Sequence, residues 1–300
     1  MDMTQNKCCR HGASLRRRRR RRRKILCFII FSCSIIAVAV FVAVGSSMIR
    51  SGDGRTNRYD VEAGNNTYDN AVIENSKISE KNKIQNNQSM LDDIMNSTQY
   101  PKQLKDLALK NEEALEFVYD YPAEHVKEHT IDLTEEASMD SVPLFVQWDK
   151  RWGYEKYSGN FFAASGCGPT TLSMVVVYLT HNREASPIAV AKYSKEAGYS
   201  VDGSGSSWTL ISEGCIHYGV KAKAVALDES RMKAELDEGH PIVVNVGPGD
   251  FTDTGHFMVI TGYDDEGFSI NDPNSIEKSG KRWLFKNISS QIRAVWSMYV

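Results

Sequence analysis

The sequence predicts an α+β fold in which a helical half packs against an antiparallel sheet. Within residues 141–300, segments with helical signals come first and segments with strand signals come last. This order is typical of α+β domains. Two of the strand segments are joined by residues 264–267, whose Asp and Gly residues are typical of a hairpin turn.

The N-terminus combines a basic block with an uncharged segment. Residues 1–24 carry eleven Lys or Arg against one Asp, and residues 25–44 carry no charge. A helix of that length spans roughly 30 Å of hydrocarbon, whereas a cleaved signal peptide has a shorter apolar core. We expect a basic cytoplasmic tail over 1–24 and a transmembrane signal anchor over 25–44. Because positive residues stay inside, the rest of the chain is expected to be extracellular.

Two further regions precede the domain. Residues 45–97 are rich in Asn, Ser and charged residues, which predicts a flexible linker. In residues 98–140, Leu104, Leu107 and Leu115 recur near helical spacing, which predicts a helical N-terminal extension. An inhibitory role and a purely packing role are both compatible with this pattern.

The domain itself, residues 141–300, is predicted to contain four helices and five strands. Proline and glycine mark several helix ends: Pro187 suits a start, and Gly198 and Gly219 suit stops. The helices are expected near 169–180, 187–197, 208–218 and 230–238. The strands are expected near 221–227, 241–246, 256–263, 267–271 and 294–299.

Cys167 is the strongest candidate for a catalytic residue. It lies between Gly166 and Gly168, directly before Pro169 and an apolar run, so we expect it at a helix N-terminus. The free N–H groups and the dipole at that position favour the thiolate, which is the nucleophilic form. Glycines on both sides admit a substrate backbone, so both are substrate-binding candidates.

A nucleophile needs a base, and the base needs a group that orients it. His256 begins one predicted strand, and Asp272 follows the next strand along the chain. Because a hairpin brings the start of one strand close to the end of the other, we expect His256 and Asp272 to be cross-strand neighbours.

These motifs, taken in order, resemble the peptidase C39-like family, which has a papain-like cysteine peptidase fold. The matching pieces are residues 147–149, 166–170, 205–208, 251–257 and 271–275. The resemblance implies that Cys167 is the nucleophile, His256 the general base and acid, and Asp272 the residue that orients His256. It also implies a membrane-anchored bacterial member.

One feature departs from the better-known members, which place an oxyanion-hole Gln shortly before the Cys. Six residues before Cys167 this chain has Phe161, and the nearest upstream Gln is Gln147. We assign the oxyanion role to Gln147, together with the Cys167 backbone N–H. Trp208 and Gly255, which lie in matched motifs, are further substrate-binding candidates.

The prediction is therefore a membrane-anchored, extracytoplasmic cysteine peptidase that acts on peptide or protein substrates and needs no metal or cofactor. Cell-wall peptides are an alternative substrate, with hydrolysis or acyl transfer as the reaction. A catalytically silent surface module that binds peptides or cell-wall fragments is the alternative from another class. The Arg run abuts the uncharged segment, which argues against nucleic-acid binding.

Two other patterns receive ordinary interpretations. His125 to His129 has the spacing of an inverted zinc-peptidase motif, but no third ligand accompanies it, so we expect a solvated helix end. Cys215 is expected to be a buried small hydrophobe, because pairing with Cys167 would block the nucleophile.

Overall fold

The computed structural model describes residues 65–300, with side chains from residue 79 onward. Contacts within the chain divide it after Val72, and the fold below is that of residues 73–300. The expected tail over 1–24 and the expected anchor over 25–44 lie outside the described residues. Among the residues that are described, no helix combines the length and the apolar character needed to cross a membrane.

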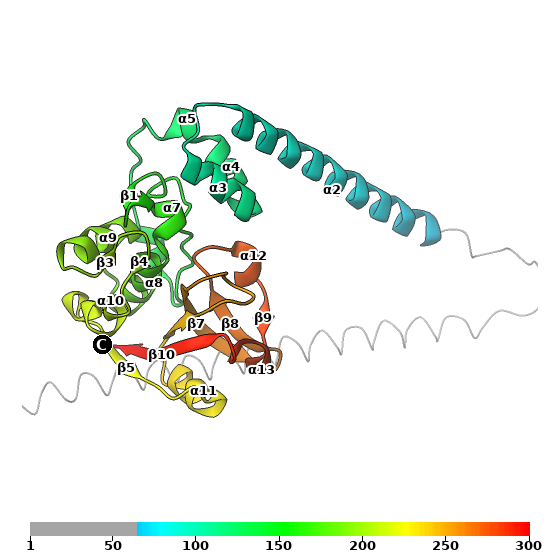
Figure 1. Cartoon of the computed structure of the whole chain (residues 1–300). Coiled ribbons are helices and arrows are strands. Elements are labelled where there is room, and N and C mark those ends of the chain that lie inside the picture. Colours follow the sequence, from blue (N-terminus) through cyan, green and yellow to red (C-terminus); the bar gives the residue numbers. More distant parts are fainter. Residues whose placement is uncertain (1–64) are drawn as a thin grey trace, which may run out of the picture. The chain divides into compact units, whose positions relative to one another are not determined.

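A six-stranded antiparallel sheet forms the C-terminal half of the fold (Figure 1). Its strand order is β5-β10-β6-β7-β8-β9, and each neighbouring pair is antiparallel. The strands are β5 (Lys221–Ala224), β6 (Ile242–Val246), β7 (His256–Asp264), β8 (Gly267–Asn271), β9 (Arg282–Trp283) and β10 (Ile292–Tyr299). The α+β prediction is confirmed, and all five predicted strands are present. The sixth, β9, has two residues and is too short to show a strand pattern.

Helices cover both faces of the sheet. Side chains on a strand alternate between its two faces, so neighbouring residues pack into different clusters. Val259 of β7 packs into a cluster with the apolar residues of α8 (Cys167–Thr180). The next residue, Ile260, packs into a second cluster with those of α11 (Glu229–Asp237). The helix that begins with Cys167 is therefore fixed against the strand that begins with His256.

The helices of the helical half lie around α8, and they begin close to their predicted positions. α9 (Pro187–Glu196) starts with Pro187, and the preceding Ser186 accepts a hydrogen bond from the Ala189 N–H. The single helix predicted over 208–218 is instead two short ones, α10 (Thr209–Ser212) and the 3₁₀ helix η2 (Gly214–Tyr218). Glu213 lies between them, and η2 begins at Gly214, which has a low helix propensity and lies against the Tyr199 ring.

Several short elements carried no recognisable pattern in the sequence. β1 (Lys156–Tyr157) and β2 (Asn160–Phe161) form a hairpin whose turn residues, Ser158 and Gly159, both have positive φ. The others are α6 (Thr134–Ser138), α7 (Phe162–Ser165), β3 (Ser200–Val201), β4 (Gly205–Ser206), α12 (Ile276–Ser279) and α13 (Phe285–Ile288). All are five residues or shorter, so their positions depend on packing.

The linker prediction for 45–97 is corrected over Asn65–Asn96, which forms the helix α2 (Figure 1). No Gly or Pro interrupts this stretch, so nothing in its backbone stops a helix. Near its end Ile94 is fully buried in a cluster with the residues that follow. Polar composition suggested a linker, but contacts at one end and the lack of helix breakers favour a helix.

The predicted helical extension is present as short segments. They are α3 (Lys102–Lys110), the 3₁₀ turn η1 (Glu112–Ala114), α4 (Leu115–Tyr119) and α5 (Tyr121–Glu124). Because α5 ends at Glu124, His125 and His129 do not share a helix face. Among the described residues, no group of three or more His, Cys, Asp or Glu side chains is placed to hold a metal ion.

Candidate active site

Cys167 is the first residue of α8, as the sequence predicted, and Gly166 is its N-cap. The short helix α7 leads directly into it, so a sharp turn presents the thiol at the start of α8. Cys167 is half-buried and Cys215 fully buried, and neither forms a disulfide. Of the two cysteines in the described part of the chain, Cys167 is the one that combines partial exposure with a helix N-terminus.

His256 and Asp272 are cross-strand neighbours, as the hairpin predicted. Val259 of β7 pairs with Asn271 of β8, which places Asp272 just beyond β8 and diagonal to His256. The His256 Nε2 donates to the Asp272 Oδ1 over 2.7 Å. The same oxygen accepts the Asn274 backbone N–H at 2.8 Å. Asp272 is fully buried and His256 is 6% exposed, so water competes little for their hydrogen bond.

The His256 imidazole sets the charge state of the thiol. Burial alone would raise the pKa of Cys167, but the hydrogen bond and charge of His256 outweigh it and lower that pKa. The backbone N–H groups of Phe257 and Gly168 lower it further. Burial alone would lower the pKa of His256, but Asp272 and the thiolate together raise it to about 10. Both shifts favour a thiolate–imidazolium pair.

The hydrogen bond to Asp272 also fixes the orientation of the imidazole. Because Nε2 donates to Asp272, Nδ1 is the ring nitrogen left for the Cys167 thiol. A fixed imidazole that shares a proton with a thiol can act as general base and then as general acid.

Gln147 is buried and bridges the two halves of the site. Its backbone N–H donates to the Pro273 carbonyl and its Nε2 to the Ala163 carbonyl, both at 2.7 Å. Pro273 follows Asp272, and Ala163 lies in α7, just before Cys167. The amide has one further N–H, which is free to serve another acceptor. Gln147 thus has a bridging role that the sequence did not indicate.

Gly166 and Gly168 are both buried, and the structure gives a packing reason for each. A Cβ at Gly166 would lie 2.6 Å from the Phe162 ring, and one at Gly168 would lie 2.6 Å from the Ser206 Oγ. These distances are too short for any larger side chain without rearrangement. Their assignment as substrate-binding residues stays a prediction.

Trp208 and Gly255, the other substrate-binding candidates, are exposed. The Trp208 side chain is 48% exposed, and its ring meets that of Trp296 edge-on at 6.0 Å between centroids. Trp296 in turn lies 6.4 Å from the ring of Phe257, the residue after His256. A row of three aromatic rings therefore runs from the surface to the strand that carries His256.

Tyr157 and Ser206 also lie beside the site. Ser206 belongs to the matched motif 205–208, but the sequence assigned it no role, and it gave no signal for Tyr157. The Tyr157 hydroxyl is hydrogen-bonded to the Ser206 Oγ at 2.6 Å and the Ser194 Oγ at 2.8 Å. Burial is the main cause of the raised pKa of Tyr157, and the charge of Cys167 adds to it. Together with the contact of Ser206 at Gly168, this network supports the start of α8.

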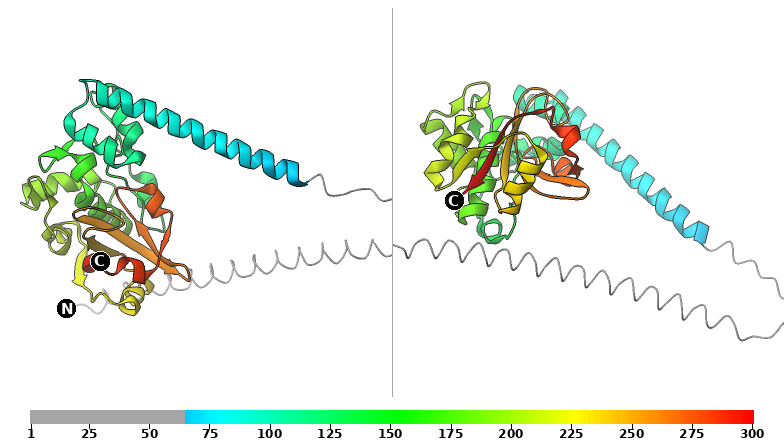
Figure 2. Two further views of the ribbon diagram at one scale, coloured as in Figure 1. Left: turned by 45° about the vertical axis from the view of Figure 1, so that its right-hand side comes forward. Right: turned by 90° about the horizontal axis from the view of Figure 1, so that it is seen from below.

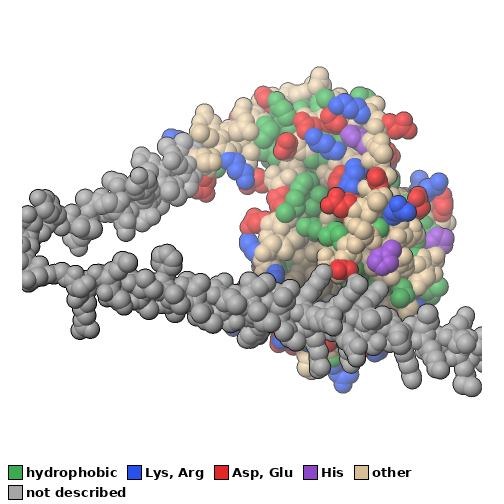
Figure 3. All heavy atoms as spheres, turned by 180° about the vertical axis from the view of Figure 1, so that it is seen from behind, with side chains coloured by type: hydrophobic (Ala, Val, Ile, Leu, Met, Phe, Trp, Pro, Cys, Tyr) green, Lys and Arg blue, Asp and Glu red, His purple; other side chains and the backbone are tan. Residues whose placement is uncertain are grey.

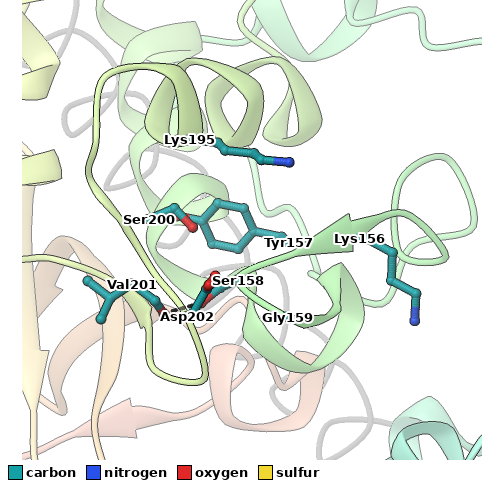
Figure 4. Close-up of a pocket in the computed structure, with 8 residues that line it drawn as sticks. All are labelled: Lys156, Tyr157, Ser158, Gly159, Lys195, Ser200, Val201 and Asp202. Carbon is teal, nitrogen blue, oxygen red and sulfur yellow. Dashed lines mark hydrogen bonds between the residues drawn. The ribbon is translucent and has the colours of Figure 1, made fainter.

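A cavity of about 440 Å³ lies beside Tyr157, between the β1–β2 hairpin, the β3–β4 hairpin and α9 (Figure 4). Its lining residues are Lys156, Tyr157, Ser158, Gly159, Lys195, Ser200, Val201 and Asp202. Cys167, His256 and Asp272 are not among them, so we assign this cavity no part in the reaction.

Comparison with known proteins identifies the family of the chain. The sequence profile described as "Peptidase_C39 like family" matches residues 139–300. No curated protein sequence matches the chain.

Two solved structures are similar to part of the chain. The peptidase domain of Streptococcus ComA, a bi-functional ABC transporter involved in quorum sensing, is 20% identical, with a TM-score of 0.36. That likeness covers 45% of this chain and 90% of the domain. A Bacillus anthracis protein described as a C39-like peptidase is 18% identical, with a TM-score of 0.33, covering 53% of this chain and 95% of its own.

The pKa shifts of Cys167 and Cys215 predict how the two thiols react at different pH values. Because the pKa of Cys167 is lowered, its reaction with iodoacetamide should persist to lower pH than the reaction of an ordinary thiol does. Burial raises the pKa of Cys215 to about 11, so Cys215 should react slowly over the same pH range. Mass spectrometry of the labelled full-length chain measures each site separately.

The matched variant is His256→Ala. Removing the imidazole should move the Cys167 profile toward that of an ordinary thiol and leave Cys215 unchanged. Equal profiles for Cys167 in the two proteins would contradict a thiolate–imidazolium pair.

Proposed function

Because the chain belongs to the Peptidase_C39 like family, we propose that its domain hydrolyses peptide bonds with Cys167 as nucleophile. The observation that carries this proposal is the chain of contacts from Cys167 to His256 to Asp272, with the last contact fully buried. The family implies a peptide or protein substrate.

In the proposed mechanism the Cys167 thiolate attacks the carbonyl carbon of the scissile peptide bond. The C–S bond forms as the carbonyl oxygen takes the negative charge. When the tetrahedral intermediate collapses, the C–N bond breaks and the His256 imidazolium gives its proton to the leaving amine. His256, now neutral, takes a proton from water, which attacks the thioester. The C–S bond then breaks and releases the carboxylic acid product, leaving the Cys167 thiolate beside the His256 imidazolium. Asp272 holds the imidazole in place throughout.

The oxyanion is proposed to be stabilised by the Cys167 backbone N–H and the second N–H of Gln147. The first of these groups is at the start of α8, where backbone donors point out of the helix. The second is available because Ala163 uses only one N–H of the amide. Both donors are held by secondary structure or burial, so little reorganisation accompanies the reaction.

One face of the domain has no feature of a nucleic-acid interface. On the face shown in Figure 3, acidic and basic side chains are intermixed. Nucleic-acid binding needs a basic stripe or patch, and the described residues visible on that face form none.

We propose that the exposed Trp208 contributes an apolar contact for the substrate.

We further propose that residues 25–44 anchor the chain in a membrane, with the peptidase domain on the outer side. The support is the uncharged segment and the basic block before it. If added protease digests the domain in intact cells, the proposal holds. Digestion only after lysis would place the domain inside.

Cys167→Ala is predicted to abolish hydrolysis, because the proposed mechanism has no other nucleophile. Incubation of the full-length chain with a mixed peptide library, read by mass spectrometry, measures cleavage. Cys215→Ala removes a thiol that lies fully buried, and it should retain cleavage. Cleavage that survives Cys167→Ala would refute the mechanism. A wild-type chain that binds peptides without cutting them would favour the silent module.

Gln147→Ala is predicted to lower kcat by about 10²–10³-fold, as expected for loss of an oxyanion donor. The alkylation of Cys167 should change little, since Gln147 is not part of the thiolate–imidazolium pair. Gln291 is another buried glutamine, bonded to Asp250. Gln291→Ala is therefore the control for loss of a buried amide. An equal loss of kcat in both variants would mean that Gln147 acts only through packing.

A further inference from the structure

The N-terminal extension is bonded to the loop that carries Asp272. Glu113, in the turn η1, accepts the backbone N–H groups of Ile276 at 2.7 Å and Glu277 at 3.1 Å through its Oε2. Its Oε1 accepts the hydroxyl proton of Ser275. A single carboxylate from 162 residues away in the sequence thus binds three donors at the start of α12.

A second side chain of the extension holds the same loop. The Asn111 Nδ2 donates to the backbone carbonyl of Asn274 at 2.9 Å and to its Oδ1 at 3.1 Å. The Asn111 Oδ1 meanwhile accepts the Glu113 backbone N–H at 3.0 Å. Asn111 therefore fixes the loop and also fixes the turn from which Glu113 reaches it.

The residues held in this way are the ones that hold Asp272. The Asn274 N–H donates to the Asp272 Oδ1, the same oxygen that accepts the His256 Nε2. The Ser275 N–H donates to the Asp272 carbonyl at 3.2 Å. Hydrogen bonds thus run from Asn111 through Asn274 to the carboxylate that orients His256, and from Glu113 through Ser275 to the Asp272 backbone carbonyl.

The extension also packs on the side of the site that carries the thiol. Leu104 and Leu107 of α3 share a buried cluster with Phe161 of β2 and Ala163 of α7. Those two elements lead into Cys167. Figures 1 and 2 show α3 and α4 beside α7 on one side and near α12 on the other. The extension therefore contacts both the segment that leads into Cys167 and the loop that follows Asp272, and Gln147 connects the same two regions.

We propose that Glu113 and Asn111 are positioning residues for the proposed Cys–His–Asp reaction, and that the extension supports catalysis and does not inhibit it. They do not touch the reacting atoms; they fix the loop from which Asp272 reaches His256. This inference rests on the proposed function, because it concerns the same triad.

The test compares Glu113→Gln with Glu112→Gln in the full-length chain. Both remove one negative charge, but the Glu112 carboxylate is exposed and bonded to Asn87 of α2 instead. In Glu113→Gln, an NH₂ group replaces one carboxylate oxygen, so a single acceptor oxygen remains for three donors. We expect kcat to fall about 10- to 100-fold, the scale of a small misplacement of a catalytic group. KM should change little, and Glu112→Gln should match the wild type.

A second readout needs no substrate. With Asp272 displaced, the imidazolium of His256 is less stabilised, so the Cys167 alkylation profile should move toward higher pH in Glu113→Gln. Asn111→Asp should shift it in the same direction. This variant keeps the acceptor for the Glu113 N–H but loses the donor to Asn274, so it tests the loop contact even if Glu113→Gln does not fold.

The outcomes separate the two proposals. If wild-type Cys167 titrates as an ordinary thiol, the proposed function fails and the positioning role fails with it. If wild-type Cys167 shows the lowered pKa and both variants share its profile and kcat, only the positioning role is overturned. A rise in kcat in Glu113→Gln would show that the extension restrains the site, which also overturns the proposal.

Discussion

The buried hydrogen bond between His256 and Asp272 is the constraint on which the site depends. A buried carboxylate is costly unless it is paired and hydrogen-bonded, because burial removes its hydration. Its partners here come from β7 and from the loop after β8, so the sheet register must hold for the pair to exist. The lowered pKa of Cys167 follows from that pair, because Asp272 orients the His256 imidazolium and the imidazolium stabilises the thiolate.

The two halves of the site come from different parts of the fold and have to be held together. α8 carries the thiol, and it is packed against β7 through the core on one face of the sheet. Gln147 joins the segments before Cys167 and after Asp272 from within the domain. The extension joins the same two regions from outside, through Leu104 and Glu113. Core packing, Gln147 and the extension therefore each connect the part of the fold that carries the thiol to the part that carries the His256–Asp272 pair.

The sequence revealed the catalytic candidates that have a recognisable pattern in their neighbouring residues. Cys167 was recognisable from the helix start around it, and His256 and Asp272 from the strands and turn that join them. Glu113 and Asn111 were not, because a single polar residue in an amphipathic segment resembles any solvated side chain. The polar composition of α2 predicts a linker for a related reason: composition contains no information about the contact that Ile94 makes at the end of the helix.

By itself, the sequence determined the α+β class and most of the longer elements, because these depend on propensities and spacings within windows of about 11–18 residues. It also determined the order Cys, His, Asp, because each of the three lies in a recognisable local motif. Only the tertiary structure decided that Gly166 and Gly168 are packed against Phe162 and Ser206, that Gln147 bridges two segments, and that Glu113 reaches α12. Such contacts join residues far apart in the chain. They exist only once the sheet register and the helix packing have brought those residues together.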